Sequence, residues 1–235
     1  MFRRTIDGLE LTFHLAGINN QNFLMRDEQT GTYWQQISGR AISGPLSGRE
    51  LTLVSADELS FALWKKEQPA GTVLKDVPER KGDYAPINWD ARMARTPTVI
   101  GYEQAGLKAR DLMVGVHAFG VARAFPYERI RKEKLIQDNF GGEPIAVVLG
   151  PDAASVRVFR RRLPGGRTVT QFYLLPEGTL LDSETGTRWK FSGCAISGLQ
   201  AGKCLDRINA IKDYWFDWRN YNPQTTVYGV RQPIR

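Results

Sequence analysis

The chain of 235 residues contains one sequence pattern twice. DEQTGTYWQQISGRAISG begins at Asp27, and DSETGTRWKFSGCAISG begins at Asp182. The common register continues as far as Trp64 and Trp218, which is too long a match for chance. Two copies are too few for a solenoid, which needs at least about three repeats to cover its ends. We therefore expect a duplicated unit packed about a pseudo-two-fold axis, with one core shared by the two copies.

Each copy has the pattern of a small β unit. LELTFHL and FLMRD alternate between apolar and polar residues, and the Thr-Gly of EQTGT marks a turn before YWQQI. Each copy ends in a stretch that suits a short helix before a proline, DELSFALWKKEQP and IKDYWFDWRNYNP. The predicted fold is therefore mainly β: a β-rich α+β chain of two strand-turn-strand units, each with a short helix.

The repeat also predicts how the chain is organised. We expect a first repeat over residues 1–75, an irregular connection over residues 76–110 and a second, complete repeat over residues 111–230. The second repeat opens with LMVGVHAFGVARAFP, whose pattern is that of a β-hairpin, and continues to the apolar strand PIAVVL. We expect the two repeats to form one compact domain.

The motif Asp-x-x-Thr-Gly stands at the same place in both copies. An aspartate there accepts hydrogen bonds from nearby backbone N–H groups, and the glycine takes the positive φ of a tight turn. Aspartic proteases also carry Thr-Gly in each half, but the preceding residue here is Gln29 in one copy, which cannot ionise. Two copies so far apart do not suit propeller blades either. We therefore assign turn or core roles to Asp27, Thr30, Gly31, Asp182, Thr185, Gly186, Trp64 and Trp218.

A few aromatic, basic and polarisable side chains are the candidate ligand-binding groups. Each tryptophan buries about 150–250 Å², so core packing accounts for the repeated ones, with a stacking groove for a sugar or peptide between the copies as the alternative. His117, in VGVHAFG, and His14, in TFHLAG, are expected to be half-buried with a ring nitrogen bonded to backbone, or else to serve a ligand or a proton. The candidate ligand-binding residues are Arg40, Trp34, Trp189, Arg123, His117 and Cys194.

Cysteine and histidine are too scarce to indicate a metal centre. Two of each do not make a zinc quartet of the usual spacing, and two cysteines do not make a disulfide framework. We expect Cys194 and Cys204 to be buried, inert thiols, with a reactive thiol near Lys203 as the alternative. Ser43 and Ser197 have no His or Lys beside them in the sequence, so loop hydrogen bonding is the preferred role. No catalytic residue, metal or cofactor is predicted.

The charge pattern bears on partners and compartment. The formal net charge is +7, with basic clusters in RIRKEK and RVFRRRLPGGR. Glutamates interrupt the first cluster, and alternation along a strand divides the second between two faces, which argues against nucleic acid. No apolar run approaches the roughly 18 residues of a membrane helix. The start, MFRRTIDGLELTF, has no export signal, so on this sequence the protein is expected in the cytoplasm.

Several short motifs together resemble a bacterial family catalogued as domain of unknown function 3179. They are G-x-A-x-A-[YF]-P at 120–126, Asp-Asn and Gly-Gly before PIAVV, the D-x-x-T-G-[ST]-x-W turns, G-x-A-I-x-G-P-L at 39–46 and the W-x-x-x-x-P-x-x-T endings. The resemblance covers nearly the whole chain, and it implies no established activity. Members similar to this chain tend to show W-H-E and C-P-L-C, where the second repeat has KEK at 132–134 and GPDA at 150–153.

The two copies differ in length. Phe2-Arg3 aligns with Phe159-Arg160, so the first copy lacks a counterpart of the hairpin and strands that open the second. We therefore expect about 45 residues of the first repeat to lie upstream of Met1, together with any His or Cys residues of the family and any signal sequence, in which case the protein would belong to the cell envelope or be exported.

Three functions remain open on these grounds. The preferred one is a non-catalytic ligand-binding or interaction domain, with a pocket for a small molecule, sugar or peptide between the copies, lined by the repeated aromatics, Arg40 or Arg123. The first alternative is an enzyme or a metal or thiol protein whose key residues lie upstream of Met1. The second is binding of an anionic polymer through the basic clusters.

Overall fold

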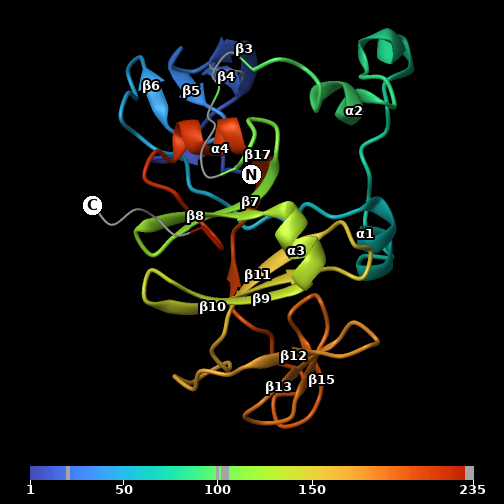
Figure 1. Cartoon of the computed structure of the whole chain (residues 1–235). Helices are drawn as coiled ribbons and strands as arrows, with labels where there is room; N and C mark the ends of the chain where they lie inside the picture. Colours follow the sequence, from blue (N-terminus) through green and yellow to red (C-terminus); the bar gives the residue numbers. More distant parts are fainter. Residues whose placement is uncertain (20–21, 99–100, 102–105, 231–235) are drawn as a thin grey trace.

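The computed structural model describes residues 1–19, 22–98, 101 and 106–230. The prediction of a mainly β fold is confirmed, because antiparallel sheets dominate and the helices are few and short. Two small sheets, one from each repeat, lie at opposite ends of the molecule in Figure 1, and two further sheets lie between them. The pseudo-two-fold axis stays a prediction.

The sheet of the first repeat has the strand order β3-β4-β5-β6, all antiparallel. It follows the short hairpin β1–β2. β3 forms one edge of the sheet, and its register with β4 shifts at a bulge between Leu15 and Gly17. The strands are β1 (Thr5–Ile6), β2 (Leu9–Glu10), β3 (Phe13–Asn19), β4 (Asn22–Asp27), β5 (Tyr33–Gln35) and β6 (Ala41–Ser43).

The end sheet of the second repeat has the same antiparallel arrangement, in the order β12-β13-β14-β15. Phe172 pairs with Asp182 in this sheet, as Phe13 pairs with Asp27 in the first. β12 is the edge strand that corresponds to β3. The strands are β12 (Phe172–Leu174), β13 (Leu180–Asp182), β14 (Arg188–Trp189) and β15 (Ala195–Ser197).

The two middle sheets come from the second repeat and face each other across an apolar core. One has the order β17-β7-β8-β18 and the other β16-β11-β10-β9. β7 and β8 form a hairpin that turns at Phe119 and Gly120, both at positive φ, which agrees with the hairpin pattern. The strands are β7 (Leu112–Ala118), β8 (Val121–Pro126), β9 (Leu135–Phe140), β10 (Glu143–Leu149), β11 (Val156–Arg160), β16 (Arg207–Ile208), β17 (Ile211–Tyr214) and β18 (Thr226–Val227).

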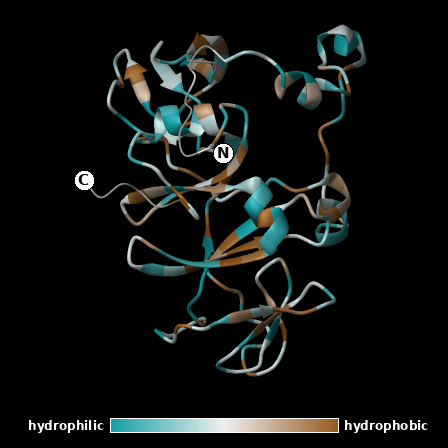
Figure 2. Cartoon of the chain, in the orientation of Figure 1, coloured by the Kyte–Doolittle hydropathy of each residue, from teal (hydrophilic) through white to brown (hydrophobic). Residues whose placement is uncertain are grey.

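Apolar side chains from both middle sheets fill the space between them. In Figure 2 parts of these strands carry the brown of hydrophobic residues. Val116 on β7, Phe125 on β8 and Val147 on β10 are fully buried there, and α3 (Tyr127–Glu133) adds Ile130. Their burial gains roughly 25 cal/mol for each Å² of apolar surface removed from water. This core positions β7, and β7 with its neighbour β17 forms one wall of the site described below.

Each repeat ends in a short helix, as predicted, and each helix contacts the other repeat. α1 (Phe61–Glu67), capped by the Ser60 hydroxyl, places Leu63 in the core of the second repeat beside Phe172 and Trp189. α4 (Trp215–Tyr221) lies next to the first-repeat sheet. The buried tryptophans of α4 pack on its own repeat, beside Met113 and Ala124, and Asp217 joins this helix to Asn22 of the first repeat. The predicted connection contains a 3-10 helix at Pro78–Asp83 and α2 (Trp89–Met93).

Candidate functional site

A cleft of about 530 Å³ lies between the first-repeat sheet and the middle strands β7 and β17. Its first-repeat wall includes Phe2, Phe13, Met25 and Leu53, and its middle wall includes Gly115, His117, Ile211 and Trp218. The lining is therefore predominantly apolar. Such a cleft, with a few polar groups, is the usual form of a binding site in a soluble protein.

Packing of Trp218 across β7 shapes the floor of this cleft. The indole lies so close to Gly115 that a Cβ built there would meet the ring at 2.2 Å. Only glycine allows this approach. The Trp218 indole N–H donates to Thr225 Oγ1 at 2.8 Å, which fixes the ring in place. Above this floor, Leu53 is 46% exposed and Ile211 is 38% exposed, so a ligand would remove apolar surface from water.

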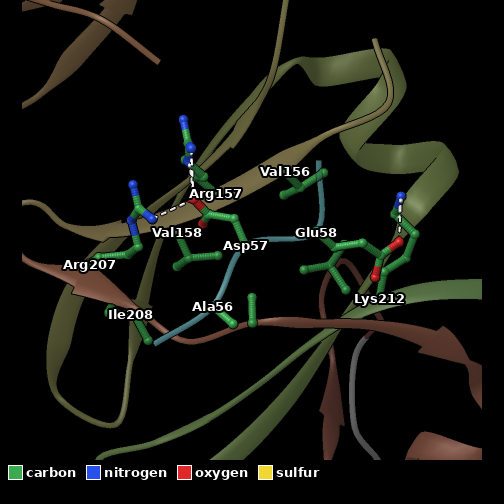
Figure 3. A pocket seen from close by; sticks show the side chains of 11 residues that line it. Ala56, Asp57, Glu58, Val156, Arg157, Val158, Arg207, Ile208 and Lys212 are labelled. Atoms are coloured by element: carbon green, nitrogen blue, oxygen red, sulfur yellow. Dashed lines mark hydrogen bonds and ion pairs between the residues drawn. The ribbon is translucent and has the colours of Figure 1, made fainter. Parts of the chain in front are cut away.

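A charged segment, Asp57 and Glu58, forms the rim that the cleft shares with a small neighbouring pocket (Figure 3). Asp57 Oδ2 accepts hydrogen bonds from Arg157 at 2.7 Å and from Arg207 at 2.6 Å. Glu58 points the other way and pairs with Lys212 at 3.2 Å. Burial raises the pKa of Asp57, but the two guanidinium groups outweigh it and hold the pKa below its usual range. Asp57 is thus held in place and ionised.

Arg157 anchors this rim from inside the protein. Its side chain is only 3% exposed and binds Asp57 and Glu67, both from the first repeat, with the guanidinium over the Phe191 ring at 4.6 Å. Burial lowers the pKa of Arg157, but the hydrogen bonds to the two carboxylates outweigh it and leave the pKa raised. A buried charge is tolerated only when it is paired in this way. The clamp holds α1 and the cleft rim on the second repeat.

Two carboxyl groups, Asp213 and Asp217, lie together beside the cleft. Asp213 Oδ1 accepts from the backbone N–H of Tyr214 at 2.7 Å, and Asp217 accepts from the side-chain amide of Asn22, a cleft residue. Asp213 Oδ2 is buried and has no donor among the described residues. Burial and the neighbouring Asp217 raise the pKa of Asp213 to about 8, and burial also raises that of Asp217. A protonated Asp213 that donates to Asp217 satisfies both groups.

The aspartates of the repeated turns bind the repeated tryptophans. The indole N–H of Trp34 donates to Asp27 Oδ2 at 2.8 Å, and that of Trp189 to Asp182 Oδ2 at 2.9 Å. All four side chains are essentially buried. Burial raises the pKa of Asp27, but the hydrogen bond from Trp34 and those from its own turn outweigh it and leave the pKa lowered. Trp34 and Trp189 therefore lie inside the two end sheets and line no cleft wall.

The remaining turn residues complete these two turns. Thr30 and Thr185 each donate a hydroxyl and a backbone N–H to their aspartate, and both following glycines have positive φ. Gly31 and Gly186 supply that conformation. Trp64 is only partly buried and stacks on Phe61 at 5.6 Å, outside the tryptophan–aspartate pattern.

The expectation of free cysteines is wrong. Cys194 and Cys204 form a disulfide, and neither is buried, because Cys194 is partly exposed and Cys204 is exposed. The two residues face each other in an isolated antiparallel bridge, the arrangement that Arg40 and Glu50 have in the first repeat. The sequence alone does not predict this pairing, because it does not show that the backbone turns these two positions toward each other. No free thiol is left for ligand or redox chemistry in this chain.

Only one of the predicted ligand-binding residues lies in the cleft. His117 lines it and is exposed, so the expectation that it is half-buried is wrong, because its position on β7 faces the cleft rather than the core. His14 is also exposed, on β3. Arg40 is exposed at the far end of the first-repeat sheet. Arg123 joins β8 to its neighbours through Asp138 and Thr226.

The aspartate pair is the part of the site that the sequence did not reveal. A signal was present in the repeat itself, because Asp213 and Asp217 align with Leu59 and Leu63 of the first copy. Two positions that are leucine in the first copy are therefore aspartate in the second. Across the described residues, no group of three or more His, Cys, Asp or Glu could hold a metal ion. No helix in the described part of the chain is long and apolar enough to cross a membrane.

Comparison with known proteins identifies the family and nothing more specific. No curated protein and no solved structure matches the chain. A family model described as protein of unknown function (DUF3179) matches residues 1–225, which is nearly the whole length. The resemblance carried by the hairpin, turn and Trp-Pro-Thr motifs is therefore confirmed, and the chain belongs to the DUF3179 family.

Proposed function

We propose that the chain is a non-catalytic ligand-binding or interaction domain that takes its ligand in the cleft between the first-repeat sheet and strands β7 and β17. The observation that carries this proposal is the cleft itself, about 530 Å³ with a mainly apolar lining and exposed Leu53 and Ile211. Covering these side chains removes apolar surface from water, which favours a ligand with an apolar body.

Polar groups at the edges of the cleft would orient such a ligand. His117 on β7 and Asn22 on β4 lie on opposite walls, and Arg3, Arg4, Asp57 and Glu58 also line the cleft. A ligand that suits this lining is apolar in the middle with hydrogen-bonding groups at its ends. A peptide fits that description better than a sugar, because the wall offers a broad apolar surface to side chains.

The basic clusters give less support to binding of an anionic polymer. In the second cluster, Arg157 is buried against carboxylates, and Arg161 bonds the backbone carbonyls of Ile145 and Thr170. Arg162 pairs with Glu143 at 2.9 Å. These guanidinium groups already have partners inside the protein, so they offer little to phosphate groups.

The two histidines make a matched test of the proposal. Titration of the chain with the apolar dye 8-anilinonaphthalene-1-sulfonate should give one saturable site, and His117→Trp should weaken it about tenfold or more by filling the cleft. His14→Trp makes the same change at an exposed strand position that does not line the cleft. Circular dichroism checks that both variants fold. Equal dye affinity in the wild type and in folded His117→Trp would remove the proposal.

A further inference from the structure

The edge strand β12 of the second repeat is covered by one side chain, that of Gln137 on β9. The carboxamide of Gln137 donates from Nε2 to the carbonyl of Phe172 at 3.1 Å and accepts at Oε1 from the N–H of Phe172 at 2.9 Å. Two hydrogen bonds in this arrangement imitate a paired strand. The backbone N–H and C=O of Phe172, the first residue of β12, therefore both have hydrogen-bond partners.

Phe13 holds the corresponding place in the first repeat. Its ring meets Trp34 edge-on at 5.9 Å, as Phe172 meets Trp189 at 6.5 Å. The N–H of Glu28 donates to the carbonyl of Thr12, the bond that Ser183 makes to Gln171 in the second repeat. Because hydrogen-bonded and non-hydrogen-bonded pairs alternate in an antiparallel ladder, the backbone N–H and C=O of Phe13 point away from β4.

These two backbone groups of Phe13 lie on the open edge of β3. Phe13 lines the cleft, and no hydrogen bond to its N–H or C=O comes from any residue within the described ranges. Gln137 has no structural counterpart here, because the described residues place no strand beside β3 other than β4. An amide donor and acceptor therefore stand side by side at the wall of an apolar cleft.

Arg4 shows the same difference between the two repeats: its counterpart in the second repeat, Arg161, bonds a strand that the first repeat lacks among the described residues. Its carbonyl accepts from Leu11 at 2.7 Å, as the carbonyl of Arg161 accepts from Thr170 at 3.0 Å. In the second repeat the Arg161 guanidinium then bonds the carbonyl of Ile145 on β10 at 3.1 Å. The side chain of Arg4 instead pairs with exposed Glu10 and lines the cleft. A surface pair of this kind contributes little, so Arg4 is available to a carbonyl in the cleft.

The apolar surface of the cleft also corresponds to a surface that a strand covers in the second repeat. In the second repeat, Ala146 and Val148 of β10 pack into the cluster that contains Phe159 and Trp189. In the first repeat, Phe2 occupies the place of Phe159, since both rings lie against a positive-φ glycine, and Phe2 lines the cleft. A strand such as β10 is what the second repeat uses to cover this surface.

We propose that the cleft binds an extended polypeptide segment that carries a glutamine side chain within an apolar strand, the carboxamide pairing with the N–H and C=O of Phe13. This inference rests on the proposed function of the cleft and names its ligand class. Arg4 bonds a backbone carbonyl of the segment, and the apolar side chains of the segment cover Phe2 and Leu53. Main-chain pairing along an open strand edge is a common way to recognise peptides.

The chain itself provides the probe. A synthetic peptide of residues 135–149, LIQDNFGGEPIAVVL, carries Gln137 and the β10 strand. Isothermal titration of this peptide into the whole protein should show one binding site. The same peptide with Gln137→Leu should bind at least about tenfold more weakly, because two hydrogen bonds are lost. His117→Trp should also weaken binding, and His14→Trp should not. The NMR signals of the two histidine side chains should locate the bound peptide, since only the chemical shift of His117 should change.

The outcomes of this titration distinguish the glutamine-peptide inference from the proposed function of the cleft. Equal affinity of the peptide and its Gln137→Leu form, or binding that leaves the His117 signal unmoved, would overturn the glutamine-peptide inference. Dye binding in the cleft without peptide binding would overturn it as well and leave the proposed function standing. Failure of both the dye and the peptide would remove both proposals.

Discussion

Replacing Asp213 with asparagine is expected to make the protein more stable at alkaline pH. Burial and Asp217 raise the pKa of Asp213 from an ordinary 3.8 to about 8, so the folded chain keeps a proton there that the unfolded chain has released. Stability from this group is complete below about pH 4 and is lost as the pH rises to about 8. The asparagine amide donates to Asp217 at every pH and removes this loss.

The size of the effect follows from the pKa. One pKa unit corresponds to about 1.4 kcal/mol, which gives a ceiling of about 6 kcal/mol for the full change. Allowing for relaxation around the pair, we expect Asp213→Asn to match the wild type near pH 4 and to exceed it by about 2–4 kcal/mol near pH 8.5. In a chain of this length, that corresponds to a Tm higher by roughly 5–15 °C.

Urea unfolding followed by tryptophan fluorescence between pH 4 and pH 9 measures this difference directly. Asp206→Asn is the matched control, because it makes the same change at an exposed position outside the aspartate pair and should not reproduce the gain at alkaline pH. Wild-type and Asp213→Asn curves that run parallel across this pH range would refute the shared-proton account of the pair.

Three further outcomes follow from the repeated turns and the disulfide. Reduction of the Cys194–Cys204 bond, whose cysteines are ten positions apart, should lower the free energy of unfolding by about 2–3 kcal/mol, and an unchanged Tm in dithiothreitol would speak against this. Cysteines at Arg40 and Glu50, the equivalent bridge, should form a second disulfide, seen as a mass lower by two hydrogens, whereas persistent free thiols would contradict the equivalence. Trp34→Phe should cost about 2–4 kcal/mol in thermal unfolding, since the buried aspartate loses a donor, and a cost below about 1 kcal/mol would argue against that bond.

The main architecture could be predicted from the sequence because its signals are local. Alternation in LELTFHL and FLMRD indicates strands, and Thr-Gly at Gly31 and Gly186 indicates turns, since positive φ depends on the residue that adopts it. The hairpin of β7 and β8 was visible for the same reason.

The site depends on which elements meet, and that is not local. Pairing of Asp213 with Asp217 follows from the end of β17 entering α4, and the cleft follows from α4 lying against the first-repeat sheet. His117 faces the cleft because the neighbouring positions of β7 face the core. A comparison of the two copies position by position identifies Asp213 and Asp217 as carboxyl groups at positions that are leucine in the first copy. It does not show what surrounds them in the folded protein.

Amide hydrogen exchange at Phe13 tests the central claim, a peptide-binding cleft with an open strand edge, most directly. The N–H of Phe172 is bonded by Gln137 and should exchange slowly, whereas the N–H of Phe13 should exchange quickly in the free protein. Saturation with the 135–149 peptide should slow Phe13 about tenfold or more and leave Phe172 unchanged. Slow exchange of Phe13 in the free protein, or an exchange rate unaffected by the peptide, would contradict the account.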